Sequence, residues 1–151
     1  MMRACIALAC AMGVGAQEWT DTPLLSSLWE ATKNADQDSL DRLLDSSEYA
    51  ATSRATDGRG LAWWAFEFQS TYALGAILAY GGDPLSSSED ESGQAASAMC
   101  DASSSCDKAE LMEKSKAMVE DIKKRKKDRA AEREKETFDD DDDEELGEDE
   151  F

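Results

Sequence analysis

The sequence contains no histidine, and its 16 basic residues are outnumbered by 34 acidic ones. Without histidine, the usual general base, the Ser-His and Cys-His nucleophile pairs and the commonest transition-metal ligand are all missing. The formal net charge of −18 argues against a general phosphate-binding surface, which needs clustered Lys and Arg. No apolar run reaches the roughly 20 residues of a membrane-spanning helix. The composition therefore predicts a protein that is not an enzyme, binds no nucleic acid and spans no membrane.

The most apolar stretch lies at the start of the chain. Arg3 supplies a positive charge, residues 4–14 are apolar, and Val14-Gly15-Ala16 offers the small residues of a cleavage site. This pattern predicts a secretory signal peptide over residues 1–16. An apolar first helix of a cytosolic domain is the alternative. Cleavage would remove Arg3 and change the net charge from −18 to −19.

The cysteines divide between this signal and the rest of the chain. Cys5 and Cys10 lie within the signal, so a mature chain would keep only Cys100 and Cys106. An even pair in an oxidising compartment predicts a disulfide, with two free thiols as the alternative. The small loop that it closes would contribute about 2 kcal/mol in the chain-entropy model. Two thiols without histidine are too few to hold zinc.

Between Thr22 and Cys100 the sequence predicts pairs of helices separated by glycine-rich and acidic turns. Apolar residues recur at helical spacing in four stretches, residues 24–31, 40–44, 61–68 and 71–80. Glycine accepts a left-handed helix cap and proline cannot continue a helix, so residues 57–60 and 81–84 mark turns. Asp90 follows Asp57, and Gly93 follows Gly60, by 33 residues in each case. The spacing predicts a structural repeat of that length.

These features resemble the ankyrin-repeat family, whose unit is a turn plus two helices of about 33 residues. Asp57-Gly58-Arg59-Gly60 is similar to the family's Asp-x-x-Gly hairpin start, and Gly81-Gly82-Asp83-Pro84 to its Gly-Ala-Asp turn. Leu74, Ile77 and Leu78 fall where the family has its second-helix core. Residues 28–44 resemble a first repeat and residues 93–99 a truncated third. The resemblance implies an all-α stack of about two and a half repeats with a protein-binding role.

One departure from the family pattern stands at the start of the second repeat. Where the family has Thr-Pro-Leu-His, this chain has Leu61-Ala62-Trp63-Trp64. The threonine and histidine hydrogen bonds that tie neighbouring hairpins are therefore expected to be missing, with aromatic bulk in their place. Because such repeats stack only on their neighbours, a short array needs this extra burial.

Aromatic side chains are concentrated at and after this departure. Trp63, Trp64, Phe68 and Tyr72 are the candidate partner-binding residues, because aromatic side chains dominate interface hot spots. The alternative is that they fill the core of the short stack in place of missing repeats. The two interpretations differ in whether Trp64 or Phe68 faces an open groove.

Residues 107–136 are predicted to form a charged helix. Leu111, Met112, Met118, Val119 and Ile122 give it an apolar stripe that can dock on the last repeat. After Ile122 the stripe ends, so the rest of the helix is expected to protrude into solvent. The basic block at residues 123–127 is interpreted as a solvated face that pairs with the acidic tail. A nuclear-import or nucleic-acid patch is the alternative.

Residues 137–151 carry ten acidic residues and no basic one, which predicts a disordered tail. The candidate ligands for weakly bound calcium are Asp139, Asp140, Asp141, Asp142 and Asp143, although the sequence lacks an ordered calcium loop. The chain ends in Asp149, Glu150 and Phe151, similar to the end of an endoplasmic-reticulum retrieval signal of the Lys-Asp-Glu-Leu type.

The sequence thus predicts a signal peptide (1–16), an ankyrin-like domain (17–106), a charged helix (107–136) and an acidic tail (137–151). The predicted function is a protein-protein interaction adaptor with an unknown protein partner. Its predicted location is the lumen of the endoplasmic reticulum, with secretion as the alternative. No cofactor is predicted, with weakly bound calcium as the alternative. The alternative function is an acidic calcium-buffering or chaperone-like lumenal protein. A nuclear histone-chaperone-like role would require the signal peptide to be misassigned.

Overall fold

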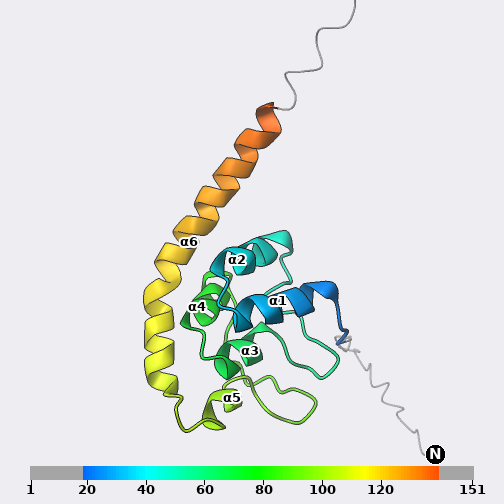
Figure 1. The fold of residues 1–151 in the computed structure, drawn as a ribbon, viewed down its shortest axis with the longest axis vertical. Helices are drawn as coiled ribbons and strands as arrows, with labels where there is room; N and C mark the ends of the chain where they lie inside the picture. Colours follow the sequence, from blue (N-terminus) through cyan, green and yellow to red (C-terminus); the bar gives the residue numbers. More distant parts are fainter. Residues whose placement is uncertain (1–18, 140–151) are drawn as a thin grey trace, which may run out of the picture.

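The computed structural model of the protein describes residues 19–139 (Figure 1). In this range the chain forms six helices and no sheet, so the all-α prediction is confirmed. The helices are α1 (Pro23–Lys33), α2 (Gln37–Ser46), α3 (Leu61–Glu67), α4 (Thr71–Ala79), α5 (Ala98–Asp101) and α6 (Lys108–Asp139). None of these helices has the length and apolar character needed to cross a membrane. The predicted signal peptide lies outside the described residues.

The described helices form two layers. In one layer α1 packs on α3 and α3 on α5; in the other α2 contacts α4 and α4 contacts α6. Because α1 also packs on α2, and α3 on α4, each successive pair contributes one helix to each layer (Figure 1). Leu28, Phe66 and Leu74 are fully buried and belong to the hydrophobic core.

The first two pairs make the same tight turn between their helices. The Asp36 carboxylate caps α2 by accepting a backbone N–H bond of 3.0 Å, and the Ser70 hydroxyl caps α4 in the same way at 3.1 Å. The residue before each cap has a positive φ, 54° at Ala35 and 50° at Gln69. The two turns are therefore structurally equivalent, and they are 34 residues apart.

Two hairpin loops project on the side of the molecule away from α6 (Figure 1). An antiparallel bridge closes the first between Arg54 and Gly60, and another closes the second between Glu89 and Ala95. Equivalent bridge residues are thus 35 positions apart. The repeat length of 33 residues predicted from the sequence is therefore wrong for the hairpins.

The backbone of the hairpins shows why the offset was misassigned. Gly58 donates its N–H to Ala55, and Gly93 donates its N–H to Asp90, so Asp90 corresponds to Ala55 and not to Asp57. Both glycines have φ near 80°, a left-handed conformation that glycine adopts without steric cost. The sequence Asp-x-x-Gly occurs at residues 57–60 and again at 90–93, which suggests that Asp57 and Asp90 are equivalent. The hydrogen bonds show instead that the position equivalent to Asp90 is Ala55, two residues before Asp57.

The first half of α6 packs along α4 through the predicted apolar stripe. Leu111, Met112 and Ile122 are buried. Gly75 allows the two helices to approach closely, because a Cβ there would lie 2.9 Å from the Ser115 carbonyl oxygen and 3.1 Å from the Ile122 Cδ1. A glycine inside a helix costs about 0.5–1 kcal/mol relative to alanine, and this close packing offsets that cost.

The second half of α6 lies against α2 through ion pairs. Arg129 contacts Asp41 at 2.8 Å and Asp45 at 2.7 Å, while Arg125 contacts Asp41 at 3.0 Å and Arg133 contacts Asp45 at 3.2 Å. The two carboxylate side chains are only 1% and 5% exposed. The prediction that the helix protrudes directly after Ile122 is wrong, because acidic side chains of α2 hold it where the apolar stripe ends.

Tyr72 of α4 and Tyr80, the residue that caps the end of α4, complete this ionic contact. The Tyr72 hydroxyl donates to Asp41 at 2.7 Å, and the Tyr80 hydroxyl donates to Asp45. Burial, and then these hydrogen bonds, raise the pKa of both hydroxyls. Arg129 also donates to the Tyr80 hydroxyl at 3.2 Å. The contact therefore links α2, α4 and α6 in one layer.

Cys100 of α5 and Cys106, which precedes α6, form a disulfide, with their Cα atoms 5.4 Å apart. The predicted pairing is confirmed. Because Cys100 is buried in the core, the bond ties the segment that leads into α6 to the rest of the molecule.

Candidate interaction surface

The four aromatic residues predicted to bind a partner lie mostly inside the molecule. Trp63, Trp64 and Tyr72 are 6%, 7% and 7% exposed and belong to the hydrophobic core. Phe68 is partly buried and packs edge-on against Trp29, with ring centroids 6.0 Å apart. This burial favours the core interpretation for the first three residues and leaves little of them for a partner to touch.

Trp63 nevertheless shapes the loop side of the molecule. Its indole N–H donates to the Gln94 carbonyl in the second hairpin at 3.1 Å. The Arg54 guanidinium lies between two indoles, 4.5 Å from the Trp63 ring centroid and 4.4 Å from that of Trp19. Each such cation–π contact is worth about 0.5–2 kcal/mol, depending on its desolvation. Sequence reasoning missed Trp19 and Arg54, because neither belongs to a periodic pattern and their contact depends on the fold.

Arg54 also joins the two hairpins. Its Nε donates to the Gly58 carbonyl at 2.6 Å within the first hairpin, and its Nη2 donates to the Glu89 carbonyl in the second. Burial lowers the pKa of Arg54, and the nearby Asp90 carboxylate opposes part of that shift. Hydrogen bonds from Arg54 and Trp63 therefore tie the two hairpins together, from positions that differ from the threonine and histidine of the family pattern.

Asp90 fixes the second hairpin from inside. Its Oδ1 accepts backbone N–H bonds from Ser92 at 2.9 Å and Gln94 at 3.0 Å, and its Oδ2 lies 3.5 Å from the Arg59 Nε. Burial raises the pKa of Asp90, but hydrogen bonds from Ser92 and Gln94 lower it by more. Side chains thus set both the shape of the hairpins and their distance from each other.

A hollow of about 340 Å³, the loop hollow, lies between the segment before α3 and the segment after α4. Its apolar lining residues include Leu61, Ala62, Trp63, Ile77, Pro84 and Ala96, and its hydroxyl-bearing residues are Thr52, Ser53, Ser86 and Ser88. Ligand sites in proteins commonly measure roughly 300–1,000 Å³ and combine apolar walls with a few polar groups. The loop hollow has both properties at the lower end of that size range.

Exposed apolar side chains accompany the loop hollow. A neighbouring hollow of about 220 Å³ shares Thr52, Ser53 and Arg54 with it and is also lined by Tyr49. Tyr49 is 66% exposed, and Leu85, between two residues that line the loop hollow, is 48% exposed. Exposed aromatic and aliphatic side chains beside a concave surface are typical contacts for a protein partner.

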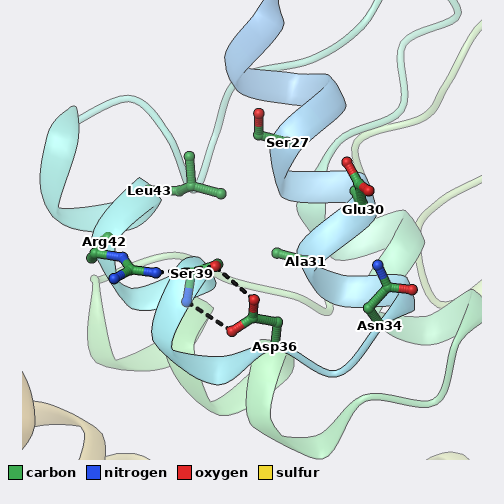
Figure 2. Close-up of a pocket in the computed structure, with 8 residues that line it drawn as sticks. All are labelled: Ser27, Glu30, Ala31, Asn34, Asp36, Ser39, Arg42 and Leu43. Carbon is green, nitrogen blue, oxygen red and sulfur yellow. Dashed lines mark hydrogen bonds between the residues drawn. The ribbon is translucent and has the colours of Figure 1, made fainter.

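A different hollow, of about 410 Å³, lies between α1 and α2 (Figure 2). Most of its lining is polar, and includes Glu30, Asn34, Asp36, Ser39 and Arg42. Figure 2 shows Asp36 and Ser39 bonded to each other, with the hydroxyl donating to the carboxylate at 2.6 Å. A polar outer face is typical of the terminal unit of a repeat stack, which must meet water. We therefore interpret this hollow as a solvated outer face of α1 and α2.

The remaining predicted site residues lie at or beyond the end of the described chain. Asp139 is the last residue of α6, and the predicted calcium ligands Asp140 to Asp143 lie outside the described residues. The retrieval-like residues Asp149, Glu150 and Phe151 also lie outside them. Within residues 19–139, acidic and cysteine side chains form no group of three placed to hold a metal ion. Calcium binding and retrieval stay predictions.

A scan against models of protein families, a search of curated proteins and a search of solved structures found no match to the chain. The resemblance to ankyrin repeats therefore rests on this chain's own residues.

Proposed function

We propose that the protein is a non-catalytic interaction adaptor that binds an extended segment of another protein at the loop hollow. The loop hollow itself carries this proposal, because it combines an apolar floor, hydroxyl groups and two hairpins that Arg54 and Trp63 bond together. A surface that is already ordered loses little conformational entropy when it binds. The hydroxyl groups can bond the main chain of a bound segment while the floor accepts one of its side chains.

The ankyrin resemblance supports the same role. The helix-to-helix turns recur after 34 residues and the hairpins after 35, close to the roughly 33-residue unit of that family. Stacks of this kind present extended surfaces built from loops and helices, and many serve as binding scaffolds. An adaptor role fits this architecture without a catalytic group.

We propose further that the protein works in the secretory pathway, in the lumen of the endoplasmic reticulum or after secretion. The Cys100–Cys106 disulfide supports this location, because such bonds persist in oxidising compartments. The apolar start of the chain and the final Asp149-Glu150-Phe151 support it from the sequence. N-terminal sequencing of the protein from fractionated cells tests the location. A lumenal chain that begins at Gln17 is expected, and a cytosolic chain that retains Met1 would contradict it.

Substitution inside the loop hollow tests the binding role. Peptides of 12 residues would be selected from a random displayed library on the immobilised, oxidised full chain, and their affinities measured by fluorescence anisotropy. Ala62→Phe places a large ring in the hollow and is expected to weaken the selected peptides at least tenfold. Ala131→Phe makes the same change on an exposed part of α6 and is the matched control. The melting temperature of both variants shows whether the fold is kept.

The binding role would be wrong under either of two results. One is that no peptide is enriched on the full chain. The other is that enriched peptides bind the Ala62→Phe variant as tightly as the unchanged protein.

A further inference from the structure

The carboxylates on the two sides of the molecule have different surroundings. On α2, Asp41 and Asp45 are paired with arginines of α6. On the loop side, Asp83, Glu89 and Glu91 are exposed, and within residues 19–139 they form no ion pair. No basic side chain of the described residues is therefore paired with these three carboxylates, which lie on the loop side of the molecule.

The distribution of basic residues explains this difference. Residues 19–106 hold four basic residues against fourteen acidic ones, whereas α6 alone holds eleven basic residues. Of those four, Arg54 lies between two indoles, Arg59 lies against Asp57 and Asp90, and Lys33 lies over the Trp29 ring. The fourth, Arg42, lines the polar hollow between α1 and α2. The helix α6, which carries these eleven basic residues, lies on the opposite side of the molecule from the hairpins (Figure 1).

We infer that the segment bound at the loop hollow is cationic, with Lys or Arg residues beside one apolar residue. This inference rests on the proposed function. The apolar residue fills the hollow against Ala62 and Ile77, and the cations meet Asp83, which lines the hollow, and Glu89, which follows the lining residue Ser88. Charges at the rim of an interface act mainly on association rate and on partner choice, and salt weakens their effect.

The same observations argue against two other occupants. An anionic ligand would be repelled by the exposed carboxylates, and the Arg54 guanidinium is already engaged by two carbonyls and two rings. A second copy of this chain would have to offer its basic residues from α6. That helix is held against α2 and α4 and cannot enter the hollow as an extended strand.

Charge reversal at Glu89 tests the inference. The Glu89 side chain is exposed and accepts no hydrogen bond within the described chain, so Glu89→Lys is expected to fold normally. Peptides selected on the unchanged full chain are expected to be enriched in Lys and Arg. Glu89→Lys should weaken them about tenfold at low ionic strength, with a smaller difference at about 0.3 M salt because the charges are then screened. Glu30→Lys makes the same charge reversal at the polar hollow between α1 and α2 and should change the affinity less than about twofold.

The outcomes separate this inference from the proposed function. Selected peptides that lack Lys and Arg but lose affinity for Ala62→Phe would leave the binding role in place and overturn the cationic inference. Basic peptides that bind Glu89→Lys as tightly as the unchanged chain would also overturn it, because their attraction would then come from another acidic part, such as residues 139–150. Failure to select any peptide would overturn both.

Discussion

The two halves of α6 hold the same helix to the repeat domain by different physical means. The half that starts at Lys108 buries Leu111, Met112 and Ile122 against α4, where Gly75 lets the helices touch. The half that follows Ile122 is held by arginines bonded to buried carboxylates of α2. The first contact is with α4, which lies next to α6 in the layer, and the second is with α2, which lies beyond α4.

The comparison indicates that one half of α6 supplies most of the free energy of docking and the other half fixes the position of the helix. Burial of apolar area supplies free energy at roughly 25 cal/mol per Å² but has little directional preference. Charged hydrogen bonds are directional, and their net contribution depends on the complete set of partners. We therefore expect the apolar half to decide whether α6 docks and the ionic half to decide where its distal part lies.

The largest effect is expected from closing the space between α4 and α6. Gly75→Val would place its Cβ 2.9 Å from the Ser115 carbonyl oxygen, a backbone atom that cannot rotate away as a side chain can. We expect a loss of about 3 kcal/mol in the free energy of unfolding, since overpacking of a core commonly costs about 1–3 kcal/mol and here meets backbone. Urea denaturation followed by circular dichroism measures it.

A matched control separates packing from helix propensity. Ala109→Val introduces the same β-branched residue at an exposed position in the first turn of α6 and should cost less than about 0.7 kcal/mol. Equal losses for the two variants would mean that the close approach at Gly75 contributes nothing.

A smaller effect is expected from the ionic half. Arg129→Ala leaves Asp41 and Asp45 buried with fewer donors, while Arg125 and Arg133 still reach them. Removing one partner of a buried ion pair costs about 3–5 kcal/mol, and the remaining arginines should reduce this to about 2 kcal/mol. The same denaturation experiment measures the loss, and hydrogen exchange should show faster exchange after Ile122 than before it.

The control for this variant is Arg133→Ala. The Arg133 side chain is 55% exposed and shares Asp45 with Arg129, so its removal should cost less than about 1 kcal/mol. If Arg129→Ala also cost so little, or if exchange rose equally along the whole of α6, the ionic half would have no positioning role.

The same contrast explains how much of the fold could be predicted from the sequence. The apolar half of α6 was predictable because Leu111, Met112 and Ile122 share one face at helical spacing. The disulfide was predictable from the count and spacing of Cys100 and Cys106. In both cases the signal is local, and burial or pairing follows from residue type.

The ionic half was not predictable for a physical reason. A string such as Lys123 to Lys127 has the composition of a solvated surface, and only the fold brings Arg125 and Arg129 to the carboxylates of α2 more than 80 residues earlier. Asp41 likewise sits among Leu40, Leu43 and Leu44 without a sign that it is buried. Long-range ion pairs leave no periodic mark in either segment.

The candidate site was predicted only in part, and its most visible residues were misleading. Trp63 and Trp64 were predicted to bind a partner because aromatic residues dominate interface hot spots, but both side chains are buried in the hydrophobic core. The exposed positions, Tyr49 and Leu85, stand alone in loops with no pattern around them. The Arg54 bonds that hold the hairpins depend on a register of 35 residues that side-chain identity alone obscured.

The smallest effect that we predict concerns the protonation of Asp45. Burial raises the pKa of Asp45, but hydrogen bonds from Arg129, Tyr80 and Arg133 lower it by more, so the net shift is downward from its ordinary value of 3.8. Because the folded-state pKa lies below the unfolded one, ionised Asp45 stabilises the fold fully above about pH 4. That stabilisation is lost as the pH falls through the folded-state pKa.

Two variants test the direction of this pKa shift. Asp45→Asn cannot ionise, so its free energy of unfolding should fall less steeply than that of the unchanged protein between about pH 5 and pH 2. Tyr80→Phe keeps the carboxylate but removes one hydrogen bond that lowers its pKa, and should give an intermediate slope. Parallel slopes in all three proteins would show that the ionic half of α6 gains nothing from the charge of Asp45. The positioning role would then have to rest on the shape of the contact and not on its charge.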